Sequence, residues 1–214
     1  MISGGCGRSE HHSNRIACME TTHASRLSYV LLTAGAVAAI AALDVVATAN
    51  AHAADAHAAR GKYLVHIMAC SDCHTPMKMG ANGPEPDMAR FLSGHPESAT
   101  LPPPPAAKGP WIWSGDATNT AFAGLWGISY AANLTPDRNT GLGIWTEQMF
   151  VDAIRTGHHM GRAREIQPPM PWTSYKQASD EDLKAIFAYL RTIKPVVNHV
   201  PEYQPPHVTS TEHS

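Results

Sequence analysis

The sequence lacks the features of a disulfide-rich, zinc-binding or nucleic-acid-binding protein. Only four of its 214 residues are cysteine, and no further Cys/His pair stands at the spacing of a four-ligand zinc site. The formal net charge is −2, without a basic stripe suited to nucleic acid or a charged block typical of an interaction tail. These absences argue against a nucleic-acid partner and direct attention to the few cysteines present.

The N-terminal apolar run, from Tyr29 to Leu43, is shorter than the roughly 20 residues that a membrane-spanning helix needs. Arg15 and Arg26 precede it, and small residues at 49–53 fit an A-x-A cleavage pattern. This arrangement predicts a secretory signal peptide and leader over residues 1–53. An uncleaved N-terminal anchor is the alternative. Because Cys6 and Cys18 lie in the leader, the exported protein would keep two cysteines.

Those two cysteines belong to the pentapeptide Cys70-Ser71-Asp72-Cys73-His74, which reads C-x-x-C-H. Two thiols three positions apart on a helical turn can add to the two vinyl groups of one porphyrin, and the following histidine can bind its iron. The pattern predicts one covalently attached haem c. A Cys70–Cys73 disulfide would not explain the histidine, and a thioredoxin-type pair would follow a strand. Bacterial haem attachment takes place outside the cytoplasm, so motif and leader together predict a periplasmic protein.

Helical periodicity predicts three helices, over about 55–70, 147–156 and 180–192. Thr146 and Ser179 are the expected N-caps of the second and third helices, and Gly157 is the expected end of the second. Gly61, inside the first, suggests a close helix crossing. The sequence thus predicts a mainly α domain over 54–200.

Long irregular loops connect these helices. Roughly 70 residues with little regular pattern separate the first two, and such a long loop is usually functional or disordered. Its aromatic residues argue that much of it is ordered and wraps a large cofactor rather than forming a floppy insertion, with Gly80 to Asp87 and the prolines at 102–105 as the more mobile parts. A flexible tail is expected over residues 201–214.

His74 would leave the opposite face of the iron open, and an electron carrier fills that position with Met or His. Met170 is the strongest candidate, because prolines on both sides stiffen the segment Gln167-Pro168-Pro169-Met170-Pro171-Trp172. Ordinary core packing is the alternative role for this methionine. Met160, His158 and His159, which follow the second helix, are the next candidates.

Taken together, these residues resemble the class I bacterial cytochromes c. Within that family the chain is similar to the single-haem proteins and to the cytochrome c subunits of alcohol and sugar-acid dehydrogenases. The matching segments span nearly the whole chain after the leader, in the family's order: Gly61-Lys62-Tyr63, Cys70 to His74, Leu92-Ser93-Gly94-His95-Pro96, Ala132 to Gly143, Pro169-Met170-Pro171-Trp172, and Ser179 to Leu190.

The resemblance implies a cleft that holds haem with one edge exposed, with His74 as proximal and Met170 as distal ligand. It also implies that the first and last helices cross near Gly61 and an aromatic residue, here Tyr189. The dehydrogenase subunits usually carry three haem units, whereas this chain has one C-x-x-C-H motif. The chain therefore departs from those subunits in architecture, and this departure does not affect the haem assignment.

Other residues are weaker candidates for contacts with the haem propionates. Asn133 and Thr135 lie in a family loop beside the haem, although a local Asx or Thr turn explains them equally well. Trp172, like Trp145 and Tyr175, could donate a hydrogen bond to a propionate or simply pack in the core. The arginines that could neutralise propionates, form a docking patch or be solvated are Arg155, Arg162 and Arg164.

The function expected from these features is electron transfer, with no bond chemistry by the protein itself. The carrier would pass electrons from a dehydrogenase to a respiratory acceptor, either an oxidase or another cytochrome, and a complex could hold it at the membrane. The alternatives are a haem enzyme of peroxidase type or a haem-based sensor. Both need an open or displaceable distal ligand.

Overall fold

The computed structural model describes residues 46–104 and 111–206. The chain divides into two units, Met1–Ala53 and Ala54–Ser214. In the first unit the described residues, 46–53, are helical and exposed, while the predicted apolar run of the signal peptide lies outside the described residues. Among the described helices, none has the length and apolar character needed to cross a membrane.

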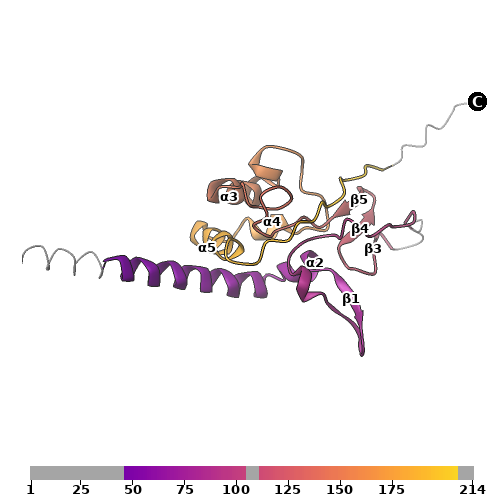
Figure 1. The fold of residues 1–214 in the computed structure, drawn as a ribbon. Coiled ribbons are helices and arrows are strands. Elements are labelled where there is room, and N and C mark those ends of the chain that lie inside the picture. The colour runs from indigo at the N-terminus through magenta and orange to yellow at the C-terminus, as the bar shows by residue number, and fades with distance from the viewer. Residues whose placement is uncertain (1–45, 105–110, 207–214) are drawn as a thin grey trace, which may run out of the picture. The chain divides into compact units, whose positions relative to one another are not determined.

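Three helices build most of the second unit (Figure 1). Residues 54–67 form its first helix. The others are α3 (Glu147–Thr156) and α5 (Asp180–Leu190), and the fold class is mainly α, as predicted. The bounds of α3 are those that the sequence predicts, whereas α5 ends two residues earlier than predicted. Short helices complete the set: α2 (Cys70–His74), η1 (Met88–Arg90), η2 (His159–Gly161) and α4 (Trp172–Tyr175).

The predicted helix caps are present. The Thr146 hydroxyl accepts a hydrogen bond from the Met149 amide at 3.2 Å, and the Ser179 hydroxyl accepts one from the Asp182 amide at 3.1 Å. Each bond satisfies an N–H group that has no partner within its helix. Gly157 ends α3 in a left-handed conformation with φ 72°. Local chemistry therefore fixes both ends of α3 and the start of α5.

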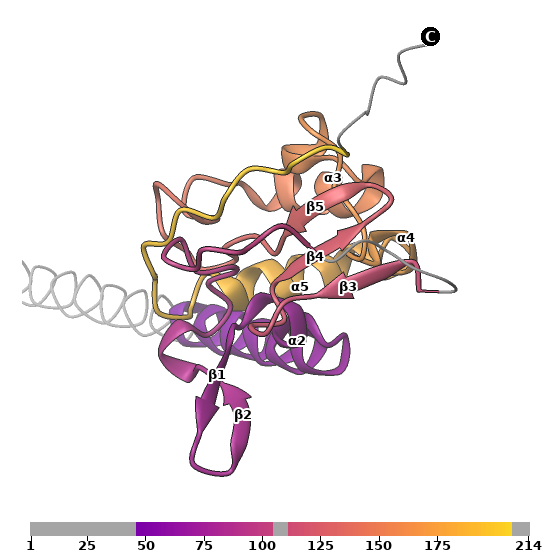
Figure 2. The same cartoon turned by 90° about the vertical axis from the view of Figure 1, so that its right-hand side faces the viewer.

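The first helix crosses α5 at Gly61, where there is no room for a side chain (Figure 2). A Cβ at this position would lie 1.8 Å from the Ala185 carbonyl oxygen and 2.9 Å from the Tyr189 Cβ. Beside the crossing, Arg60 Nε and Asp182 Oδ1 form an ion pair at 3.0 Å. The expected contact between Gly61 and Tyr189 is confirmed.

Among the described residues, a hydrophobic core lies between these three helices. Phe150 of α3 and Phe187 of α5 stack with ring centroids 5.5 Å apart. Leu183 and Leu190, also from α5, are each only 1% exposed. The partly buried side chains that pack against this core include Cys70 and Met170. The core therefore adjoins the residues that carry the candidate chemistry.

The predicted irregular segment contains two small antiparallel sheets. β1 (Met77–Gly80) and β2 (Gly83–Pro86) form a hairpin, so the stretch from Gly80 to Asp87 is paired rather than irregular. The second sheet has the order β3-β4-β5, and its strands are β3 (Trp113–Gly115), β4 (Ala121–Gly124) and β5 (Gly127–Tyr130). Strands of three or four residues are too short to show a reliable alternation in sequence.

The prediction of a flexible tail from residue 201 places the start of that tail too early. Gln204 pairs with Ile128 of β5 through two backbone hydrogen bonds, of 2.8 and 3.0 Å. The Tyr203 hydroxyl also donates to the Trp126 carbonyl oxygen. The packed unit therefore continues to Pro206, and residues 207–214 lie outside the described residues.

Asp116 organises the turn between β3 and β4. Its Oδ1 accepts from the Thr120 and Ala121 amides at 3.0 and 2.9 Å, and its Oδ2 accepts from the Thr118 amide and hydroxyl at 3.1 and 2.6 Å. Burial alone would raise the pKa of Asp116. The donated hydrogen bonds outweigh burial and lower that pKa below its ordinary 3.8.

Replacing this aspartate with asparagine (Asp116→Asn) is expected to lower the free energy of unfolding by about 1–3 kcal/mol at pH 7. Because the folded-state pKa is depressed, the stabilisation is present above the unfolded pKa and is lost as the pH falls through the folded one. The difference from the unmodified protein should thus shrink below about pH 4. Denaturant unfolding at pH 7 and pH 3 measures this change. The exposed Asp55→Asn serves as the control, and an equal difference at both pH values would contradict the account.

Candidate haem site

The C-x-x-C-H motif lies on a short helix of its own. α2 (Cys70–His74) begins after Ala69, whose left-handed φ of 54° separates it from the first helix. The first helix ends at residue 67, so the sequence prediction of one helix to residue 70 misses this break. The break turns the motif away from the axis of the first helix. Both thiols and the His74 ring line the same cavity.

The two thiols are free and protonated. Burial raises the pKa of the Cys70 thiol to about 11, and burial together with the nearby Asp72 raises the pKa of Cys73. Neither cysteine is joined in a disulfide. Within residues 46–104 and 111–206, no group of three or more His, Cys, Asp or Glu side chains is placed to hold a metal ion. A zinc-type site at these cysteines therefore has no further ligands among those residues.

The His74 ring is buried and held from one side. Its Nδ1 donates to the Ala132 carbonyl oxygen at 2.8 Å, because a carbonyl can only accept. Burial lowers the pKa of His74, and the bond to Ala132 only partly offsets that shift. The ring is therefore neutral, with its proton on Nδ1 and a lone pair on Nε2, which is the form that binds a metal ion.

The cavity beside α2 has a volume of about 450 Å³. Cofactor pockets in proteins commonly measure roughly 300–1,000 Å³ and are mainly apolar. Its walls come from the first helix, α3, α5, the segment before α4 and the segment 129–145. Apolar side chains dominate these walls and include Val65, Leu134, Leu142, Phe150, Ile154, Leu183, Ile186 and Leu190.

Met170 lines this cavity from the segment that precedes α4. Its amide donates to the Gln167 carbonyl oxygen at 3.3 Å, and its own carbonyl accepts from the Trp172 amide at 2.9 Å. The Ser129 hydroxyl, on β5, donates to the Pro168 carbonyl oxygen and ties this segment to the sheet. The chain thus fixes the backbone on both sides of Met170.

These residues fit a haem c group. A pair of free thiols and a neutral imidazole stand together on α2, a thioether lines the same cavity, and the walls suit an apolar ring. This donor set matches covalent attachment at two positions and His/Met axial ligation.

Only some of the other candidates for the distal ligand line the cavity. Met160 and His159 also line the cavity, whereas His158 does not. Met160 lies in η2 with a left-handed φ of 54°, and the His159 ring packs edge-on against Trp145 with centroids 4.8 Å apart. Met79 and Met88 are exposed and do not line the cavity.

Asn133 and Thr135 form the local turn that was the alternative to propionate binding. Asn133 Oδ1 accepts from the Thr135 amide at 3.0 Å and from its hydroxyl at 2.7 Å. Asn133 Nδ2 donates to the Val196 carbonyl oxygen at 2.8 Å. Asn133 lines the cavity but Thr135 does not, so the placement of Thr135 does not support a role in haem binding.

Trp172 also differs from its predicted place. Its ring covers Gly157, where an added Cβ would lie 2.4 Å from it, and Lys176 Nζ lies 5.5 Å from the ring centroid. Trp172 does not line the cavity. It closes the end of α3 instead, because Gly157 leaves space for an aromatic ring.

Trp145, Tyr175, Arg138 and Arg164 do line the cavity. The Tyr175 hydroxyl donates to the Met68 carbonyl oxygen, and burial, with the nearby Cys70, Cys73 and Asp72, raises the pKa of Tyr175 to about 12. Arg155 is occupied elsewhere, bonded to Asp180. Sequence reasoning missed Arg138, although it lies within the family segment Ala132 to Gly143.

Comparison with known proteins agrees with this geometry. A family model described as Cytochrome c matches residues 58–194, which is more than half of the chain. The chain therefore belongs to the cytochrome c family, and membership implies haem c attached through C-x-x-C-H.

Similar proteins include the cytochrome subunit of fructose dehydrogenase from Gluconobacter japonicus, 29% identical over 148 residues. The gluconate 2-dehydrogenase cytochrome c subunit from Pantoea cypripedii is 30% identical over 147 residues. Both matches cover 69% of this chain. They cover 24% of the Gluconobacter japonicus subunit and 25% of the Pantoea cypripedii subunit. The cytochrome c subunit of a quinone alcohol dehydrogenase from Gluconobacter oxydans is 29% identical over 164 residues, covering 75% of this chain and 27% of that protein. The resemblance to dehydrogenase cytochrome subunits is confirmed, and the chain spans about a quarter of their length.

Proposed function

We propose that the protein is an exported, single-haem electron carrier in which His74 and Met170 are the axial ligands. One observation carries this proposal: Cys70, Cys73, His74 and Met170 all line one cavity with apolar walls. When bound, haem c supplies reversible one-electron chemistry at its iron.

Each of these residues has a separate task. The Cys70 and Cys73 thiols fix the ring by thioether bonds, so the cofactor cannot dissociate. His74 offers Nε2 to one face of the ring, while its bond to Ala132 holds the imidazole in place. Met170 would supply its thioether as the second iron ligand. With two protein ligands to the iron, the site would have no open position for a substrate, which favours electron transfer over peroxidase chemistry.

A single haem is proposed because the full sequence contains one C-x-x-C-H motif. The export proposal rests on the apolar run and the cleavage pattern in residues 1–53. The names of the relatives suggest a dehydrogenase as electron donor. A respiratory oxidase or another cytochrome is the proposed acceptor, and a complex with the donor could hold the protein at the membrane.

Arg138 and Arg164 are proposed to balance the charge of the haem propionates. Replacing both with glutamine (Arg138→Gln with Arg164→Gln) removes positive charge near the iron and stabilises the ferric state. The reduction potential should fall by tens of millivolts, on the order of one tenfold change in the equilibrium, which is 59 mV for one electron. Potentiometric titration measures this shift. Arg162→Gln is the control, because Arg162 is exposed and does not line the cavity.

The function is tested by a spectroscopic redox titration of the mature holoprotein. The proposal predicts a reversible one-electron transition with low-spin iron in both states and no binding of carbon monoxide to the ferrous protein. High-spin ferric iron, or rapid reaction with hydrogen peroxide, would support the peroxidase alternative. Displacement of the distal ligand by carbon monoxide would support the sensor alternative.

A further inference from the structure

We propose that Asn198, which follows α5, is a positioning residue that fixes the orientation of the His74 ring. The inference rests on the proposed role of His74 as an iron ligand. Asn198 does not line the cavity and is more than 120 residues away from His74 in sequence. Its influence passes through the segment Leu92 to Glu97, here called the supporting loop.

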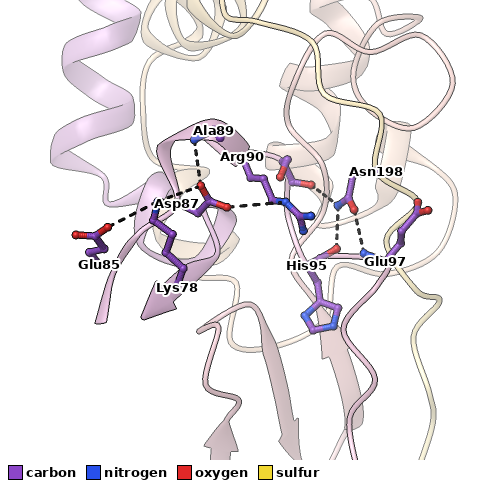
Figure 3. Close-up of polar contacts among 9 residues, drawn as sticks. Lys78, Glu85, Asp87, Ala89, Arg90, His95, Glu97 and Asn198 are labelled. Carbon is purple, nitrogen blue, oxygen red and sulfur yellow. Dashed lines mark hydrogen bonds and ion pairs between the residues drawn. The ribbon is translucent and has the colours of Figure 1, made fainter. Parts of the chain in front are cut away.

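The Asn198 side chain makes three hydrogen bonds to the main chain of the supporting loop. Its Nδ2 donates to the carbonyl oxygens of Ser93 and His95, at 2.7 and 2.8 Å. Its Oδ1 accepts from the Glu97 amide at 3.0 Å. Figure 3 shows the bonds from Asn198 to His95 and Glu97 as dashed lines. Because Asn198 is only 5% exposed, water cannot readily replace these bonds.

The supporting loop needs such external bonds because its backbone is strained. Leu92 has a φ of 57°, which L-residues rarely adopt, and Gly94 has a φ of 78°. A Cβ at Gly94 would lie 2.3 Å from the Ala131 carbonyl oxygen, so the loop also approaches the neighbouring chain very closely. The strain lies at Leu92, because glycine adopts a positive φ without cost, and a strained residue of this kind persists only where surrounding contacts hold it.

The supporting loop in turn holds His74 and the segment that carries its hydrogen-bond acceptor. The Gly94 amide donates to the His74 carbonyl oxygen at 2.8 Å. On either side of Ala132, the His95 amide donates to the Ala131 carbonyl at 2.9 Å, and the Leu134 amide donates to the Leu92 carbonyl at 2.9 Å. The acceptor of the His74 Nδ1 proton is therefore positioned by the loop that Asn198 clamps.

The hydrogen bond from His74 Nδ1 to Ala132 sets both the direction and the basicity of the imidazole. If the supporting loop relaxes, this bond lengthens and the ring becomes a weaker donor to iron. A weaker donor stabilises the ferric state less, so the reduction potential rises. The main chain at Asn198 is held separately, by a bond from its amide to the Thr140 hydroxyl at 3.1 Å. Changing the side chain therefore tests the clamp alone.

The experiment compares Asn198→Ala and Asn198→Asp with the unmodified holoprotein. NMR of the ferrous state reports hydrogen exchange of the His74 Nδ1 proton and the Gly94 amide, and voltammetry reports the potential. We expect both protons to exchange at least about tenfold faster in both variants. The potential should rise in Asn198→Ala, whereas the negative charge added in Asn198→Asp opposes that rise, so the exchange rates are the readout for the aspartate variant. Aspartate at position 198 can still accept from the Glu97 amide but cannot donate to the Ser93 and His95 carbonyl oxygens. This variant therefore tests the two donated bonds apart from the accepted one.

Ser179→Ala is the matched control, because it removes the N-cap of α5 without touching the supporting loop. It should lower stability while leaving the potential and the two exchange rates unchanged. The proposal is overturned if the Asn198 variants change only stability, or if Asn198→Asp behaves like the unmodified protein.

If the variants do not accumulate as holoprotein, native-state hydrogen exchange of the unmodified protein tests the proposal instead. The Glu97 amide, which donates to Asn198 Oδ1, and the Gly94 amide should then exchange through one opening with the same denaturant dependence, and separate openings would overturn the proposal. Absence of low-spin haem in the unmodified protein would refute the proposed function instead, which keeps the two failures distinct.

Discussion

Replacing Met170 with alanine (Met170→Ala) is expected to open the distal face of the iron and to lower its reduction potential strongly. A thioether ligand favours the ferrous state, and axial ligands shift haem potentials over a range of roughly 0.8 V. We expect a decrease on the order of 0.1–0.3 V. The weak far-red absorption of sulfur-ligated ferric haem should disappear, and the ferrous variant should bind carbon monoxide. Optical spectra and voltammetry of the purified holoprotein measure these changes.

Met160→Ala is the matched control for this prediction. Met160 lines the same cavity, so its removal creates a similar void without affecting the proposed ligand. The far-red band should persist in Met160→Ala and the potential should change little. If the band survives in Met170→Ala but is lost in Met160→Ala, the distal ligand is Met160 and not Met170.

The second large effect is expected at the helix crossing. Alanine is a better helix former than glycine by about 1 kcal/mol, so propensity alone predicts that Gly61→Ala stabilises the protein. The added Cβ, however, would lie 1.8 Å from the Ala185 carbonyl oxygen, which belongs to the backbone of α5 and cannot rotate away. Overpacking typically costs about 1–3 kcal/mol and occasionally more, and a contact this close to backbone belongs at the upper end, so the clash should dominate.

Denaturant unfolding of the holoprotein at pH 7 measures the Gly61→Ala effect. Lys62→Ala is the control, because Lys62 is the next residue on the same helix and is exposed. Its effect should stay within about 0.5 kcal/mol. A more stable Gly61→Ala protein would show that the helices separate at little cost and would contradict the close crossing.

The sequence predicted those parts of the fold that local chemistry determines. α3 has its predicted bounds because Thr146 and Gly157 terminate it through contacts within a few residues. Gly61 indicated a crossing because a glycine inside a helix is unfavourable without a packing reason. The five short strands were missed, because each depends on pairing with another segment rather than on its own pattern.

At the candidate site, too, the sequence predicted what local patterns determine and missed what depends on distant segments. The C-x-x-C-H motif and Met170 could be identified because each carries its chemistry in a compact pattern. The assignments of Thr135 and Trp172 to the haem site were not supported, because the partners that occupy them, Asn133 and Gly157, become apparent only in three dimensions. Arg138 was missed because a single arginine in a loop does not reveal which cavity it lines.

The most direct test of the central claim is the haem content of the mature protein after complete unfolding. If Cys70 and Cys73 anchor the cofactor, the intact mass in denaturant should include one haem, and the pyridine haemochrome spectrum should be that of a c-type haem at one per chain. Serine at both cysteines should abolish covalent haem. Haem that can be extracted with acid and organic solvent, or a mass that matches a Cys70–Cys73 disulfide without haem, would contradict the account.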